Sequence, residues 1–131
     1  MSLNNKPTGL CFFPAFDWAI SPTHPEREER LLYTYDQITE EGILDWECFK
    51  EYQPQKIEDN LFNQTHFLIP DVASNLTDSH RVATGGAIVL ADALMQQEIK
   101  NGFALVRPPG HHAVKLVYGN RGFCNVNHEA I

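Results

Sequence analysis

The chain has 131 residues, of which 43% are hydrophobic and 21% are charged, and it has no low-complexity tract. This composition fits one globular domain, or part of one, and argues against a disordered chain. A formal net charge of -7, with no run of basic residues, argues against nucleic acid or an anionic membrane as the main partner.

The cysteines and the N-terminal segment set further limits. Cys11, Cys48 and Cys124 are widely spaced and form no C-x-x-C pair, which excludes a zinc knuckle and a thioredoxin-like motif. Buried free thiols are the simplest interpretation. No apolar run approaches the roughly 20 residues that a membrane-spanning helix needs, and residues 1–10 lack the apolar region of a signal peptide. We therefore expect a cytoplasmic protein with no membrane partner.

The first half of the chain predicts a buried strand followed by helices. Gly9 to Phe13 form an apolar run that Pro14 closes. Residues 25–38 favour a helix, with Pro25 at its first position and acidic residues in its first turn. Short helical patterns follow at residues 43–53 and 58–63. The residues that recur at helical spacing in the first helix, and should face the core, are Leu31, Leu32, Tyr35 and Ile38.

The second half predicts a long helix and a second strand. The helix covers residues 78–101, with Asp78 or Ser79 as its cap and Gly102 as its end. Gly85 and Gly86 inside it each cost about 1 kcal/mol relative to alanine, so we expect them to pack closely against a neighbouring backbone. The apolar surface of this helix comprises Val82, Ile88, Leu90, Ala91, Leu94, Met95 and Ile99.

Phe103 to Val106 form a short apolar run between turn signals, typical of a parallel strand covered on both faces. The order of strand, helices, long helix and strand predicts an α/β layer architecture. No internal repeat or linker is visible, so we interpret residues 1–131 as one domain or part of one.

The segment RPPGHHA begins at Arg107, directly after this second strand. Loops beyond the carboxyl ends of the strands form the ligand crevice in open α/β sheets. Pro108 and Pro109 restrict the backbone, which lowers the entropy lost when the loop is ordered. Gly110 permits a turn that a side chain would block. The loop is therefore expected to hold the residues that follow in fixed directions.

Two adjacent histidines, His111 and His112, follow that turn. Neighbouring side chains usually diverge, so chelation of one metal by both is not expected. We interpret them as two imidazoles of one pocket with different hydrogen-bond partners, one of which serves as a general base near neutral pH. The alternative is that they are two polar residues of an exposed loop.

FALVRPPGHHA, followed by GFC at residues 122–124, resembles the active-site signature of the histone deacetylase family. That family includes bacterial acetylpolyamine and acetoin-utilisation relatives. SPTHPEREERL resembles its N-terminal HPERPERL segment, with Glu28 where proline is commoner, and TGGAIVLADALM resembles its long helix before the motif strand. The resemblance runs from about Thr8 to Ile131. It implies a three-layer, arginase-like α/β fold, with a mostly parallel sheet and flanking helices, that is incomplete in this chain.

The resemblance also implies an activity. Members of this family are metal-dependent amidohydrolases, usually with zinc, that act on acetyl-lysine or acetylpolyamine. The metal polarises the acetyl carbonyl and activates a water for attack. By the motif match, His111 and His112 would be the pair that contacts this water and the leaving amine.

Other site residues follow from the same match. Phe123 would form one wall of the acyl channel, and Gly122 would let the backbone approach the substrate. Asp71 lies where the family often places a rim aspartate that binds the substrate backbone. Arg107 would lie near the foot of the pocket and support the loop together with Pro108, Pro109 and Gly110. Otherwise a lone cation after a strand is most often a structural salt-bridge partner.

The last residues depart from the family pattern. FCNVNHEAI stands where the family commonly has FCYFNNVAI, so Asn125 and Val126 replace two aromatic residues. His128 and Glu129 replace an Asn-Val pair. As neighbours in a helix predicted to begin near Asn125, these two side chains would point about 100° apart. We expect a solvated or capping role for them rather than a metal site.

The family's Asp-x-His metal ligands, a later Asp and a later Tyr have no counterpart in these 131 residues, and no other trio of His, Asp or Glu shows metal-ligand spacing. We therefore expect the N-terminal portion of a zinc-dependent deacetylase that alone neither binds zinc tightly nor hydrolyses acetyl-lysine. Unpaired sheet edges would favour self-association. The alternatives are a non-catalytic module that binds acyl-lysine or a partner, and a subunit completed by another chain.

Overall fold

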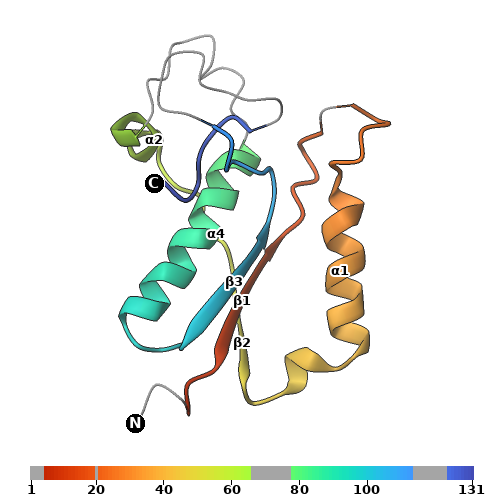
Figure 1. Cartoon of the computed structure of the whole chain (residues 1–131), viewed down its shortest axis with the longest axis vertical. Coiled ribbons are helices and arrows are strands. Elements are labelled where there is room, and N and C mark those ends of the chain that lie inside the picture. Colours follow the sequence, from red (N-terminus) through yellow and green to blue (C-terminus); the bar gives the residue numbers. More distant parts are fainter. Residues whose placement is uncertain (1–4, 20, 66–77, 114–123) are drawn as a thin grey trace.

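The computed structural model describes residues 5–19, 21–65, 78–113 and 124–131. Within them, a parallel sheet of three strands has the order β2-β1-β3. Figure 1 shows helices α1 and α4 on opposite sides of this sheet. The predicted α/β architecture, a parallel sheet with flanking helices, is therefore confirmed. The elements are β1 (Thr8–Phe13), α1 (Glu28–Glu40), η2 (Ile43–Asp45, a 3-10 turn), β2 (Phe49–Tyr52), α2 (Asp59–Thr65), α4 (Asp78–Met95) and β3 (Asn101–Val106).

Strand β1 forms the centre of the sheet and presents its two faces to the two helices. Its first residue, Thr8, pairs with Phe49 of β2 and with Asn101 of β3. Cys11 packs against α4 in a buried apolar cluster with Leu90, Ala93 and Ile99. On the other face, the ring of Phe12 stacks on Tyr35 of α1, with 4.1 Å between ring centroids. The alternation of side chains along β1 therefore joins both helical layers to one strand.

Helix α1 presents the face that the sequence predicts. Leu31 is buried and the other three predicted inward residues are partly buried, whereas Tyr33 is 71% exposed. The helix begins at Glu28 rather than at Pro25, with Arg27 in an extended conformation before it. The predicted start was wrong because Glu26 does not continue the helix and is instead buried in the polar network described below.

The helical pattern predicted for residues 43–53 was also wrong over most of its length. Only the turn η2 is helical, and residues 49–52 form the strand β2. The amide of Thr8 donates to the carbonyl of Cys48 at 2.7 Å, which aligns the segment with β1. Phe49 and Tyr52 are three residues apart, a spacing that imitates a helix in so short a window. Pairing with β1 overrides that local pattern.

Helix α4 packs against its neighbours through glycine. A Cβ atom on Gly85 would overlap the carbonyl oxygen of Gln55. A Cβ atom on Gly86 would lie 3.1 Å from Cγ1 of Val106 and 3.2 Å from Sγ of Cys11. The predicted packing against a neighbouring backbone is confirmed for Gly85, whereas Gly86 packs closely against side chains instead.

Helix α4 ends at Met95, seven residues before the glycine predicted to stop it. Gln97 has a positive φ of 59°, and the amide of Glu98 donates back to the carbonyl of Ala93 at 2.9 Å. This arrangement closes the last turn in the way that glycine usually does. Gly102 instead lies within β3.

An apolar surface remains exposed beside β3. Phe103 of β3 is 61% exposed on the face of the sheet opposite α4, because its neighbours Gly102 and Ala104 face that helix. Leu94 and Met95 of α4 are 43% and 80% exposed, so the surface predicted for α4 is buried only in part. Among the described strands, β3 pairs with β1 alone, and it is not covered on both faces as predicted. A shallow groove of about 240 Å³ follows this surface, lined by Ala87, Leu90, Ala91, Leu94, Gly102 and Ala104. No helix within the described ranges is long and apolar enough to cross a membrane.

Candidate functional site

The candidate site lies at the carboxyl end of the sheet, where β1 and β3 end. The amide of Arg107 donates to the carbonyl of Phe13 at 3.2 Å, so the two strands end side by side. The loop after β1, the loop after β3, the beginning of α4 and residues 124–131 come together at this end (Figure 1). These four segments supply the polar groups described below.

Arg107 is the most buried cation of the described residues, with 1% of its surface exposed. Its Nε donates to a carboxylate oxygen of Glu26 at 2.8 Å. Its Nη atoms donate to the carbonyl oxygens of Pro14, Ala15 and Trp18 at 2.6, 2.8 and 3.2 Å. The guanidinium also lies 5.4 Å from the Trp18 ring centroid. Arg107 therefore fastens the loop after β3 to the loop after β1, as expected of a structural salt-bridge partner.

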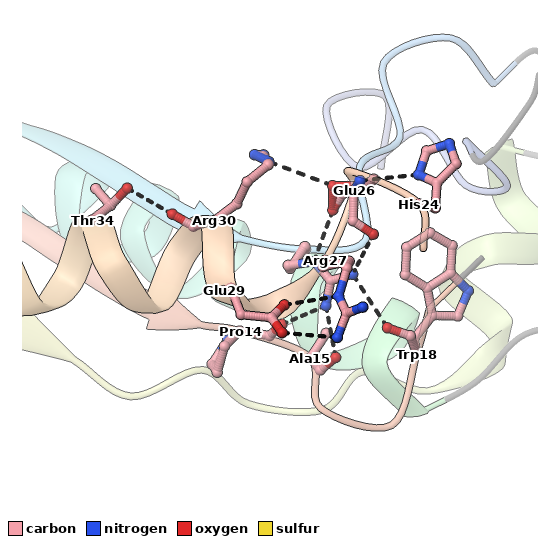
Figure 2. A network of polar contacts seen from close by, with 10 residues as sticks. Pro14, Ala15, Trp18, His24, Glu26, Arg27, Glu29, Arg30 and Thr34 are labelled. Carbon is pink, nitrogen blue, oxygen red and sulfur yellow. Dashed lines mark hydrogen bonds and ion pairs between the residues drawn. The ribbon is translucent and has the colours of Figure 1, made fainter. Parts of the chain in front are cut away.

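Glu26 has further partners around this network. Figure 2 shows it between His24 and Arg30. Its amide donates to Nδ1 of His24 at 3.0 Å, and Nε of Arg30 lies 3.6 Å from its second carboxylate oxygen. The carboxylate is 6% exposed, so two cations share one buried anion. From the sequence we expected Glu26 only to begin a helix. The HPER segment around it was the one feature that could have indicated its buried ion pair.

The two predicted catalytic histidines lie together after Gly110. Both His111 and His112 are exposed, and their ring centroids are 4.0 Å apart with the ring planes inclined at 47°. Behind them, the amide of Ala113 donates to the carbonyl of Gly110 at 3.0 Å, which closes a tight turn. The loop therefore presents two touching imidazoles to solvent at the carboxyl end of β3.

The predicted substrate contacts, Asp71, Gly122 and Phe123, lie outside the described residues. Their roles, and the pocket expected around the two histidines, stay predictions. Of the residues expected to support the loop, Arg107, Pro108 and Gly110 are buried and Pro109 is partly buried. The peptide bond between Arg107 and Pro108 is cis.

His128 does not have the solvated or capping role that we expected. It is 9% exposed, whereas Glu129 is exposed. Its Nδ1 lies 2.7 Å from Oγ1 of Thr84 in α4, and its Nε2 lies 2.8 Å from the carbonyl oxygen of Pro108. The prediction was wrong because residues 124–131 form no helix and residues 128–130 form a turn, which directs this ring inward.

A second buried histidine, His80, lies in the first turns of α4. It has no exposed surface, and its ring packs edge-on against Trp18 with 5.6 Å between centroids. Nδ2 of Asn125 donates to its Nε2 at 3.1 Å. Burial lowers the pKa of His80 to about 4, with smaller contributions from His128 and Arg81. His80 is therefore neutral at pH 7, and no signal in the sequence distinguished it from an exposed helical residue.

The described side chains do not fit a metal site. No group of three or more His, Cys, Asp or Glu residues among them could hold a metal ion. The thiols add no set of metal ligands. Cys11 and Cys124 are buried, whereas Cys48 is exposed. Burial raises the pKa of Cys11 to about 11, so that thiol stays protonated. A zinc ion would consequently need ligands from outside the described part of the chain.

Loss of the Arg107 guanidinium should destabilise the fold strongly. We expect Arg107→Met to lower the free energy of unfolding by about 3–5 kcal/mol, because it leaves the Glu26 carboxylate buried without its closest cation. Chemical denaturation at pH 7 measures the change. Arg27→Met is the matched control, since Arg27 forms a solvent-exposed pair with Glu29 and should have little effect. Equal effects of the two substitutions would contradict the role given to Arg107.

The buried neutral His80 should make stability depend on pH. Its folded pKa of about 4 lies below the unfolded value, so the unfolded chain binds more protons between these values and stability falls as pH decreases. Between pH 6.5 and 4.5 we expect a loss of about 2–3 kcal/mol, at about 1.4 kcal/mol per pH unit. His80→Gln should flatten this dependence, whereas His111→Gln, at an exposed position, should keep it. An unchanged slope in His80→Gln would contradict the assignment.

Comparison with known proteins supports one family. The family model of the histone deacetylase domain matches residues 70–131. A probable deacetylase of Archaeoglobus fulgidus is 43% identical over 129 residues, which cover 85% of this chain and 35% of that protein. A polyamine deacetylase of Danio rerio, HDAC10, is 42% identical over 57 residues, covering 44% of this chain and 8% of that protein.

The fold agrees with these sequence matches. A crystal structure of the HDA15 HD domain superposes with a TM-score of 0.77 at 26% identity and covers 95% of this chain and 41% of that one. The chain thus spans about a third of the length of the Archaeoglobus protein and less than half of the solved domain. The motifs, the sheet and these matches confirm the resemblance seen in the sequence, and the chain belongs to the histone deacetylase family as a portion of its domain.

Proposed function

We propose that this chain supplies the tandem-histidine portion of a deacetylase site that hydrolyses the acetyl-amide bond of acetyl-lysine or an acetylpolyamine. The observation that carries the proposal is the loop after β3. It holds His111 and His112 in contact at 4.0 Å, and the buried Arg107 anchors it at the carboxyl end of a parallel sheet. Parallel α/β sheets place their ligand sites at this end.

The chemistry proposed for the loop is proton transfer. One imidazole takes a proton from the attacking water as a new C–O bond forms at the acetyl carbon. An imidazolium of the pair then gives a proton to the amine nitrogen as the C–N bond breaks, which returns the pair to its starting state and releases acetate. Imidazole suits both steps because its ordinary pKa is near 6.5. We propose that Phe123, Gly122 and Asp71 contact the acyl substrate.

The substrate class is supported by the net charge of the chain and by the names of its relatives. The net charge of -7 is compatible with a cationic substrate such as a lysine-rich tail or a polyamine. The Danio rerio relative is named a polyamine deacetylase, and the Archaeoglobus relative a probable deacetylase. We place no metal on this chain. We propose that zinc serves the site of the whole protein and that its ligands lie outside these 131 residues.

A hybrid protein tests the proposal. This chain replaces the matching segment of the Archaeoglobus relative, and hydrolysis of an acetyl-lysine peptide and of an acetylated polyamine is measured. We expect activity that His111→Ala or His112→Ala lowers by about 10²–10⁴-fold, the usual contribution of general acid-base catalysis. Glu47→Gln, an exposed residue before β2, is the control. A folded, active hybrid that tolerates both histidine substitutions would refute the role of the pair.

The same assays separate the alternatives when they are applied to the 131-residue chain alone. We expect no turnover and no stoichiometric zinc. Saturable binding of the acetyl-lysine peptide without turnover would favour a binding module, and activity gained on mixing with a second chain would favour a completed subunit.

We further propose that the isolated chain self-associates through the edge of β3 and the exposed apolar surface on its two sides, with Leu94 and Met95 of α4 on one side and Phe103 on the other. Burial of this surface and pairing of the strand edge would both favour contact with a second copy. We expect sedimentation to show dimers or larger species, and the double substitution Leu94→Lys with Phe103→Lys to reduce them. A monomeric mass at high concentration would contradict the proposal.

A further inference from the structure

Residues 107–113 form the tandem-histidine loop, and residues 126–128 contact it at three points. The carbonyl oxygen of Val126 occupies the space that a Cβ on Gly110 would fill, and that Cβ would also lie 2.9 Å from the ring of His128. Nδ2 of Asn127 donates to the carbonyl of Ala113 at 3.2 Å. The His128 ring reaches the carbonyl of Pro108 at 2.8 Å. The loop is thus held before, at and after its glycine turn.

These three contacts form a clamp on the loop, and His128 also connects the clamp to helix α4. Its ring bridges Pro108 on one side and Thr84 on the other, and all three residues are buried. A backbone carbonyl can only accept a hydrogen bond, so Nε2 of His128 must carry a proton. In the neutral ring Nδ1 is then the acceptor, and the hydroxyl of Thr84 donates to it. The second acceptor within reach of that hydroxyl, the carbonyl of His80, is farther away at 3.1 Å.

We propose that His128 and Thr84 are positioning residues that hold the tandem-histidine loop against α4 through a directed chain of hydrogen bonds, from Thr84 to His128 to the Pro108 carbonyl. Neither residue touches the reacting atoms. His111 and His112 are exposed and their rings contact each other, so the direction of the pair depends on the backbone of residues 107–113. The catalytic meaning of this clamp rests on the proposed function, whereas the clamp itself does not.

The proposal makes a spectroscopic claim about the unmodified 131-residue chain. Nitrogen-15 spectra of the histidine side chains at pH 7 should show His128 as the tautomer with a proton on Nε2 and an acceptor Nδ1. A proton on Nδ1 and a bare Nε2 would overturn the proposal without any substitution. This result does not depend on whether the site hydrolyses acetyl-amides, so it is separate from the hybrid assay.

A matched pair of substitutions tests the clamp. Thr84→Val keeps the shape of the side chain but removes the donor, and Thr84→Ser keeps the donor. Loss of the bond should speed hydrogen exchange of the Ala113 amide by about tenfold, since a buried hydrogen bond contributes about 1 kcal/mol and its unpaired partner adds a cost. It should also shift the ring signals of His111 and His112. The serine variant should resemble the wild type in both readouts.

The amide of Leu10 within β1 serves as the internal control, because it lies in the middle of the sheet with strands on both sides and away from the clamp. Exchange that rises equally at Leu10 and Ala113 would mean general destabilisation. In that case the test is His128→Gln, which keeps an amide donor for the Pro108 carbonyl. Restoration of slow Ala113 exchange by that variant relative to His128→Leu supports the clamp. Identical behaviour of the two variants, or an unchanged Ala113 amide in a folded Thr84→Val chain, would refute it.

Discussion

The buried ion pair between Arg107 and Glu26 is the constraint on which the candidate site depends. A guanidinium with 1% exposure is costly to remove from water, and here it has a carboxylate and several carbonyl oxygens as acceptors. Because these acceptors come from segments about ninety residues away in sequence, the pair closes the molecule over the end of the sheet. The ion pair fixes the position of Arg107, the first residue of the loop, which local propensity alone could not do.

Close packing of α4 transmits that order to the rest of the site. Gly85 and Gly86 let the helix approach Gln55 and the sheet so closely that it cannot rotate without overlap. Thr84 directly precedes Gly85 and His80 lies five residues before it, so the directions of both side chains are set as well. One polar layer then connects α4, the loop after β3 and residues 124–131. The stability of the fold and the geometry of the histidine loop are therefore aspects of one packing arrangement.

The sequence predicts the features that depend on local pattern and fails where a distant contact decides. The apolar runs of β1 and β3 and the helical patterns of α1 and α4 were sufficient for the α/β fold, and the run at residues 103–106 placed the histidine loop directly after a strand. Strand β2 was missed because pairing with β1, not its own four residues, makes it extended. The inward direction of His128 was missed because it follows from a turn and from partners 20 and 44 positions earlier.

The distribution of the three thiols gives the chain one site for selective chemical labelling. Cys11 and Cys124 are shielded inside the fold, whereas Cys48 is open to solvent at the amino end of β2. Parallel pairing places this sulfur at the opposite end of the sheet from His111 and His112. A maleimide dye would thus react at a single, defined position remote from the loop and leave the geometry of the loop undisturbed. In air the same atom would join two copies by a disulfide, so work on the purified chain calls for a reductant.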